Sequence, residues 1–131
     1  MALSNTLIRA LMIEFIGTLF IVFASCWSLK SYELSKLTIN GLAAVNAFVL
    51  AFVSWSGFST SGAHFNPVIT FEYVFIKRKP LSTAFLYMAS QVSASVLAGF
   101  VVLVMTPLEY QQSETLPAVS FPRILPIITD F

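Results

Sequence analysis

Charge is scarce in this chain of 131 residues. Only 10% of the residues are charged and 57% are hydrophobic, whereas a soluble domain carries about 25% charged residues. The net charge is +1 and there is no long basic tract, which excludes nucleic-acid binding, because phosphate contacts need clustered Lys and Arg. The composition predicts a membrane protein, and the length allows three or four spans of roughly 20 residues each.

Cysteine and histidine are also nearly absent, since Cys26 and His64 are the only residues of their types. A lone cysteine excludes an internal disulfide, and its place in an apolar stretch favours a buried thiol. No set of ligands for a metal and no convergent acid, base and nucleophile is found. We therefore expect no metal, no cofactor and no enzymatic activity.

Three long apolar stretches predict membrane-spanning helices at about residues 5–27, 38–57 and 81–105. The first stretch is too long for a secretory signal and has no clean cleavage site, so we expect it to be retained as a helix. The second span carries a stripe of small residues, which predicts a face that packs against another helix: Ala43, Ala47 and Ala51. The third span carries two adjacent stripes, which predict burial on two sides: Ser90, Ala94 and Ala98, and Gln91, Ser95 and Gly99.

The segment 58–77 between the second and third spans breaks the apolar pattern. It starts with Gly- and Ser-rich loop chemistry, and Pro67 to Ile76 then reads as a short apolar helix. Ten residues at about 1.5 Å each cover half a bilayer, which is typical of a re-entrant segment. Lys77 to Lys79 follow it, and the positive-inside rule places them with Arg9 and the N-terminus on the cytoplasmic or equivalent side.

The start of this short helix combines two strong end signals. Asn66 suits the N-cap, and Pro67 suits the first helical turn, where its missing N–H is not needed. The helix end would point to the bilayer centre with roughly half a positive charge, offering the Asn66 amide to a passing solute and repelling cations. Irregular backbone at that depth must either line water or be buried in protein.

The stretch "SGAHFNPVIT", residues 61–70, resembles the first signature loop of the aquaporin, or major intrinsic protein, family, which usually reads Ser-Gly-Ala-His-hydrophobic-Asn-Pro-Ala-Val-Thr. "EFIGT" from Glu14 to Thr18 is similar to the family's first helix, and Gln91 agrees with its third. The resemblance covers residues 7 to about 105, the family's first half. It implies an all-α membrane protein with an aquaporin-like half fold over 1–106: three transmembrane helices plus one re-entrant half-helix.

The resemblance also implies roles for named residues. The backbone carbonyls of Gly62, Ala63 and His64 would line a pore, and the motif of Asn66, Pro67 and Val68 would lie at its midpoint, with Asn66 as the donor. Val68 replaces the usual alanine. The carboxylate of Glu14, in a span, would brace the loop by accepting hydrogen bonds, a role we favour over a proton relay. His64 is expected to brace the loop rather than to act in acid–base chemistry.

Several features depart from the family pattern. Asn46 stands where the family places a filter residue, and it is equally able to hydrogen-bond a neighbouring helix. Glu72 replaces a small residue in the half-helix, where its carboxylate either contacts a partner or reaches the membrane surface. The sequence contains no second Asn-Pro-Ala loop and no filter arginine. Four prolines in 107–131 predict an extended, proline-rich tail.

Two functions remain open at this stage. The first is an aquaporin-like half-channel that passes water or small neutral solutes once a second half, another copy or a separate chain, completes the pore. The second is a non-conducting accessory subunit of a larger membrane complex, derived from such a half. Both place the chain in a lipid bilayer as a multi-pass protein.

Overall fold

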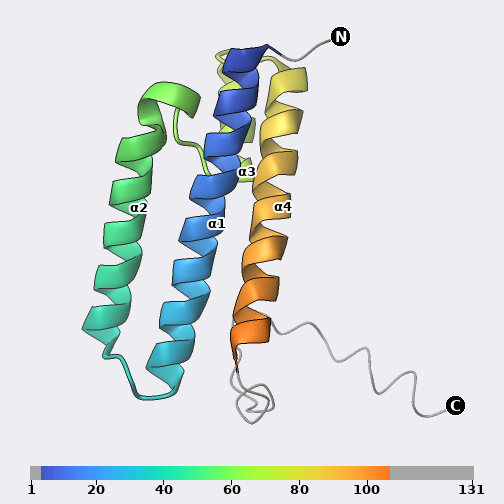
Figure 1. Cartoon of the computed structure of the whole chain (residues 1–131). Helices are drawn as coiled ribbons and strands as arrows, with labels where there is room; N and C mark the ends of the chain where they lie inside the picture. Colours follow the sequence, from blue (N-terminus) through green and yellow to red (C-terminus); the bar gives the residue numbers. More distant parts are fainter. Residues whose placement is uncertain (1–3, 107–131) are drawn as a thin grey trace, which may run out of the picture.

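The computed structural model describes residues 4–106, which form four helices and no strand. They are α1 (Asn5–Glu33), α2 (Ile39–Ser61), α3 (Pro67–Phe75) and α4 (Leu81–Met105). Three of them are long and apolar enough to cross a membrane. Figure 1 shows these three side by side, with the short α3 confined to one end of the bundle. The all-α membrane fold with three spans and one half-helix is therefore confirmed, and the predicted tail 107–131 lies outside the described residues.

Two helices run further than predicted. Helix α1 continues past Trp27 to Glu33, because the polar side chains there find partners within the helix. The Ser31 hydroxyl donates to the Trp27 carbonyl at 2.9 Å, and Lys30 pairs with Glu33 at 3.6 Å. The polar composition of residues 28–33 is typical of a loop, but the stretch contains no Gly or Pro that would end the helix.

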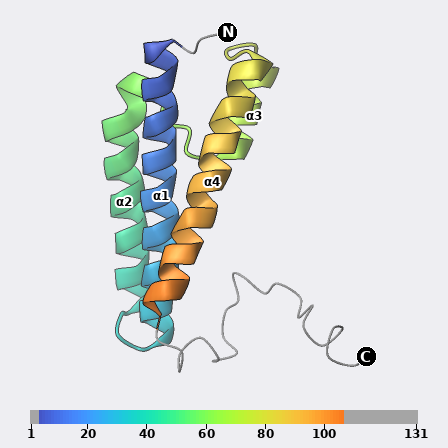
Figure 2. The same cartoon turned by 45° about the vertical axis from the view of Figure 1, so that its right-hand side comes forward.

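Helix α2 likewise continues past Gly57 to Ser61 and ends where Gly62 takes a left-handed conformation with φ of 91°. The predicted loop therefore shrinks to residues 62–66. A glycine suits this left-handed cap because it has no Cβ to clash. The half-helix α3 then rises beside α4 toward the end where α1 begins, as Figure 2 shows.

Helix α1 is the centre of the bundle, packing on α2 on one side and on α4 on the other, while α3 packs on α4. The buried face of α4 has a residue at every third or fourth position, as expected for one helical face: Ala84, Tyr87, Gln91, Ala94 and Ala98. Small residues on this face let the backbones of α1 and α4 approach closely. The second predicted stripe packs only in part within residues 4–106: Gln91 is fully buried, whereas Gly99 is exposed and a Cβ there would meet nothing within 4 Å.

The predicted packing stripe of α2 was wrong within the described residues, since Ala43, Ala47 and Ala51 are all exposed. Two other contacts set the rotation of α2 about its axis. Asn46 hydrogen-bonds to α1, and Gly57 is buried against α1, where an added Cβ would lie 2.9 Å from the Ile13 side chain. The hydrogen bonds of Asn46 and the close approach at Gly57 therefore decide which face of α2 packs on α1, and the stripe of small residues does not.

The Phe65 ring fixes the loop to the bundle. It is 7% exposed and lies between Gly17 of α1 and Gly57 of α2. A methyl group at Gly17 would overlap the ring, and one at Gly57 would lie 2.7 Å from it. Ala63 and Phe65 hold left-handed backbone angles, φ of 53° and 48°, which cost of order 1 kcal/mol or more each in non-glycine residues. The wedged ring helps to hold that strained backbone.

This packing generates a stability prediction with a matched control. Gly17→Ala forces the Phe65 ring to move, and overpacking of this kind costs about 1–3 kcal/mol. Gly99→Ala adds the same methyl group to another membrane helix in open space, so we expect no loss there. The fraction of protein that stays monodisperse in detergent after heating measures both. Equal stability of the two variants contradicts the role assigned to the ring.

Candidate functional site

The Glu14 carboxylate of α1 binds the loop of residues 62–66. Glu14 is 0% exposed and accepts three hydrogen bonds: from His64 N–H at 3.0 Å, from Phe65 N–H at 2.7 Å and from Gln91 Nε2 at 2.8 Å. A charged acceptor makes each of these bonds stronger than a neutral one. Both oxygens are engaged, so Glu14 joins α1, the loop and α4 at one point.

The N–H groups of Ala63, His64 and Phe65 are bonded inside the protein, and because N–H and C=O of a trans peptide point in opposite directions, the carbonyls of the residues before them point away from those partners. Ala63 N–H donates to the Ser61 hydroxyl at 3.0 Å, and the next two N–H groups donate to Glu14. Across residues 4–106, the carbonyl oxygens of Gly62, Ala63 and His64 accept no hydrogen bond. The loop thus offers three consecutive carbonyl acceptors without a donor among residues 4–106, and those of Ala63 and His64 belong to peptides whose N–H groups bind Glu14.

A polar network joins the start of α3 to α4. Gln91 Nε2 donates to Thr70 Oγ1 at 2.9 Å, and Thr70 Oγ1 donates to the Asn66 carbonyl at 3.1 Å. His64 Nδ1 lies 3.1 Å from the same hydroxyl. Gln91 and Thr70 are fully buried, so their pairing satisfies groups that would otherwise be costly to bury. Together these bonds set where the half-helix begins.

The tip of α3 carries the signature residues. The Asn66 side-chain oxygen accepts the Val68 N–H at 2.8 Å, capping the helix, with Pro67 in the first turn. The Asn66 amide nitrogen has no partner within residues 4–106, and the residue is exposed. Val68 is 74% exposed beside it. The cap therefore keeps a free donor at the positive end of the α3 dipole.

The Lys79 ammonium and the rings of His64, Tyr73 and Tyr87 pack together beside the loop. Lys79 Nζ lies 3.4 Å above the centre of the Tyr87 ring, and His64 contacts Tyr73 and Tyr87, with ring centroids 4.3 and 5.5 Å away. Tyr87 also donates to the Ser61 carbonyl at 3.1 Å. Partial burial lowers the pKa of Lys79, and the Glu14 carboxylate acts in the opposite direction. The ammonium thus holds the α3–α4 turn against Tyr87 of α4, and the Tyr87 hydroxyl in turn binds the end of α2.

The filter-position candidate Asn46 is placed away from the loop. Its amide nitrogen donates to Ser28 Oγ at 3.1 Å and to the Leu42 carbonyl at 2.9 Å, and its oxygen accepts from Ser25. These bonds use both hydrogens of the amide nitrogen, so the side chain joins α2 to α1.

Glu72, the partner-contact candidate, is exposed on α3. Its carboxylate has no hydrogen bond or ion pair within the described part of the chain. A charge on a half-helix at membrane depth is expensive unless it is paired or reaches the membrane surface. The lipid or protein around α3 therefore decides which of these two the Glu72 carboxylate does.

Sequence reasoning did not assign roles to Phe65 and Lys79. The signal for Phe65 was the pair Gly17 and Gly57 in two spans, which mark places where something packs too closely for a side chain. For Lys79 no local signal exists, because its contact with Tyr87 depends on how the α3–α4 turn folds back.

This sequence is similar to known proteins over most of its length. The model of the family described as Major intrinsic protein matches residues 1–123. Nodulin-26 from Glycine max is 34% identical over 94 residues, covering 70% of this chain and 35% of that protein. Aquaporin NIP1-2 from Arabidopsis thaliana is 33% identical over 101 residues, covering 76% and 34%. Aquaporin NIP4-1 from Oryza sativa subsp. japonica is 35% identical over 129 residues, covering 95% and 44%.

The chain thus spans between about a third and less than half of the length of these relatives. The family and the three span-length helices identify an integral, multi-pass membrane protein.

The Glu14 contacts predict a large loss of stability on neutralisation. Glu14→Gln turns one acceptor into a donor that faces other donors, and we expect a loss of about 2–4 kcal/mol. Glu72→Gln is the control, because that carboxylate has no partner among residues 4–106. Protease cleavage within 62–66 reports the loop directly. Resistance of Glu14→Gln equal to that of the unsubstituted chain would refute the bracing role.

The cation–π contact predicts a smaller effect. Lys79→Gln is expected to reduce stability by about 0.5–2 kcal/mol, the range for such contacts as they become desolvated. Lys77→Gln, an exposed lysine of the same turn, should change it little. Heating in detergent followed by gel filtration compares the two, and an identical response would show that the Lys79 contact contributes nothing.

Proposed function

Because this chain belongs to the major intrinsic protein family, we propose that it forms one half of a membrane pore that conducts water or small neutral solutes. Two of its relatives are named as aquaporins, and membership of a family of channels supports transport without catalysis. A second half, either another copy or a separate chain, completes the pore.

The observation that carries the proposal is the orientation of the loop backbone. Among residues 4–106 the carbonyls of Gly62, Ala63 and His64 have no donor, although the N–H groups of residues 62–65 are all paired. An unpaired carbonyl in hydrocarbon costs several kcal/mol. Water is the simplest donor for three acceptors in a row, which supports a wet path along this side of the loop.

The half-helix tip supports the choice of neutral solutes. The free amide nitrogen of Asn66 donates to an oxygen that passes the tip, as the row of carbonyls accepts from its hydrogens. The α3 dipole places partial positive charge at the same point, which disfavours cations and protons. Donor and acceptors therefore suit a molecule such as water, which needs both.

The need for a second half follows from the length of α3. Its nine residues extend about 14 Å, roughly half the hydrocarbon thickness. The described residues line only that half from one side, and Val68 at the tip faces open space. A partner with its own half-helix would enclose the path.

One observation favours a second candidate, an accessory subunit of a larger membrane complex. The Glu72 carboxylate is exposed and unpaired within the described residues, and a basic residue of a neighbouring protein would offset its charge. In that case lipid or protein, rather than water, covers the loop carbonyls.

Osmotic shrinkage of lipid vesicles tests the proposal. The purified chain is reconstituted alone and with the carboxyl-terminal half of nodulin-26; reconstitution from detergent samples both orientations. We expect at least one arm to exceed empty vesicles several-fold in stopped-flow light scattering. Val68→Trp should abolish the increase by filling the path and Asn66→Asp should reduce it, because the free donor is lost.

Val96→Trp, at an exposed position of α4, is the matched control for bulk and should leave the rate unchanged. Rates equal to those of empty vesicles in both arms reject conduction and leave the accessory subunit.

A further inference from the structure

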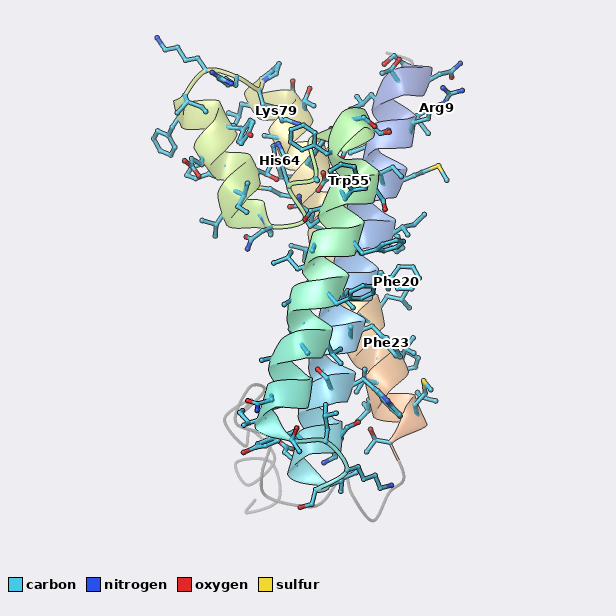
Figure 3. All side chains as sticks on the ribbon, turned by 90° about the vertical axis from the view of Figure 1, so that its left-hand side faces the viewer. Arg9, Phe20, Phe23, Trp55, His64 and Lys79 are labelled. Carbon is cyan, nitrogen blue, oxygen red and sulfur yellow. The ribbon has the colours of Figure 1, made fainter. Side chains whose placement is uncertain are left out.

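Two grooves run along the face of α1 that is turned away from the half-helix. The larger, of about 380 Å³, lies between α1 and α2, and the smaller, of about 170 Å³, lies between α1 and α4. Phe23 lines both, so the two grooves meet at its side chain. Figure 3 shows Phe20 and Phe23 on the side of the bundle opposite α3. The grooves are therefore separate from the loop and its carbonyls.

The lining of the grooves changes from polar to apolar along α1. Near the α1–α2 connection, the larger groove is lined by Trp27, Ser31 and Lys36. The smaller groove is lined only by apolar side chains: Leu19, Phe20, Phe23, Ala98 and Val101. The rings of Phe23 and Trp27 stack with centroids 6.1 Å apart and line the passage between the two parts. Tryptophan is enriched where membrane meets water, so the polar end lies in the headgroup layer and the apolar end in the hydrocarbon.

The length of the two grooves together matches one leaflet of a bilayer. Between Leu19 and Ser31, α1 rises about 18 Å, and each leaflet contributes about 15 Å of hydrocarbon. The grooves thus extend from the headgroups to about the middle of the membrane. An acyl chain that starts beside Lys36 follows them over its whole length.

The Lys36 side chain favours a lipid that carries a negative charge. It is exposed and makes no ion pair within residues 4–106, where Glu33 pairs with Lys30 instead. An ammonium at the level of the headgroups attracts lipid phosphate and donates charge-assisted hydrogen bonds to it. A sterol has an apolar body for the grooves but no charge for the lysine. The combination of charge above and apolar lining below therefore fits a phospholipid.

We propose that the two grooves bind one phospholipid, whose phosphate contacts Lys36 and whose acyl chain lies along Trp27, Phe23 and Phe20. This lipid site lies beyond the proposed function, because it is on the other side of α1 from the loop and is occupied whether or not a pore forms. The bound lipid covers apolar side chains that α2 and α4 leave uncovered.

The tryptophans of the chain allow a direct test, since the sequence has two. Trp27 lines the larger groove, whereas Trp55 is 87% exposed on α2 and lines neither groove. Trp55→Phe leaves Trp27 as the only reporter, and Trp27→Phe leaves Trp55. Bromine quenches tryptophan fluorescence on contact, so each variant in detergent is titrated with phosphatidylglycerol that carries brominated acyl chains.

We expect Trp27 to be half quenched at a lipid mole fraction roughly threefold or more below the fraction needed for Trp55, because the phosphate contact favours the groove over the remaining surface. Equal curves for the two tryptophans show only non-specific surface lipid and overturn the proposal. A Trp27 that the lipid never quenches shows that another occupant, such as a second copy of the chain, fills the groove. That result overturns the proposal as well.

Lys36→Gln tests the phosphate contact. It is expected to raise the half-quenching fraction of Trp27 about fivefold, the effect of one lysine beside anionic lipid, and Lys36→Arg should keep the native value. Lys77→Gln, an exposed lysine in the α3–α4 turn, is the matched control and should change nothing. Diacylglycerol with the same brominated chains has no phosphate, so Lys36→Gln should not alter its titration. An unchanged phosphatidylglycerol titration in Lys36→Gln overturns the proposal.

Ala24→Phe tests the groove itself, because the added ring fills the space beside Trp27. We expect it to abolish the preferential quenching of Trp27. Ala89→Phe, at an exposed position of α4 outside both grooves, is the control for bulk. Preferential quenching that persists in Ala24→Phe overturns the proposal. If Ala24→Phe does not fold, the Lys36 variants, which alter an exposed side chain, still decide the result.

Discussion

The buried carboxylate of Glu14 determines how the loop and α4 are arranged around α1 in the described part of this protein. The Glu14 carboxylate sits at 0% exposure in a chain that lies in a membrane, where an unpaired charge would be prohibitive. Three donors from two other parts of the chain offset that cost: two consecutive backbone N–H groups of the loop and the amide of Gln91. If the loop moved away from Glu14, the carboxylate would stay buried without these donors. The loop is therefore held in place.

The direction of the loop backbone follows from that constraint. With two N–H groups drawn toward Glu14 and the Phe65 ring wedged between two glycines, the preceding carbonyls have only the opposite side available. Left-handed angles at Gly62, Ala63 and Phe65 accommodate the reversal. The three carbonyls are thus left as acceptors because the N–H groups beside them are paired inside the protein. The contacts that stabilise the fold therefore also expose the groups proposed to bind water.

The sequence alone predicted the three spans, the half-helix and the motif at its tip, because each has a strong local cause: apolar length, Asn66 before Pro67, and a dense run of signature residues. Helix ends were predicted less well, since serines and an ion pair inside α1 extended it beyond its apolar stretch. The rotation of α2 could not be predicted, because bonds from Asn46 to α1 decide it. The contact between Lys79 and Tyr87 could not be predicted either, because it depends on how the α3–α4 turn folds back.

The spans differ in length. Helix α1 has 29 residues, against 23 in α2 and 25 in α4, so it measures about 44 Å against a hydrocarbon core of about 30 Å. An average bilayer accommodates the excess by tilting the helix, by thickening locally or by letting its last turns stand in the headgroup layer. Because the turns past Trp27 carry Ser28, Lys30, Ser31 and Glu33, the excess length of α1 suits the headgroup layer, and the apolar stretch before it is close to the thickness of an average hydrocarbon core.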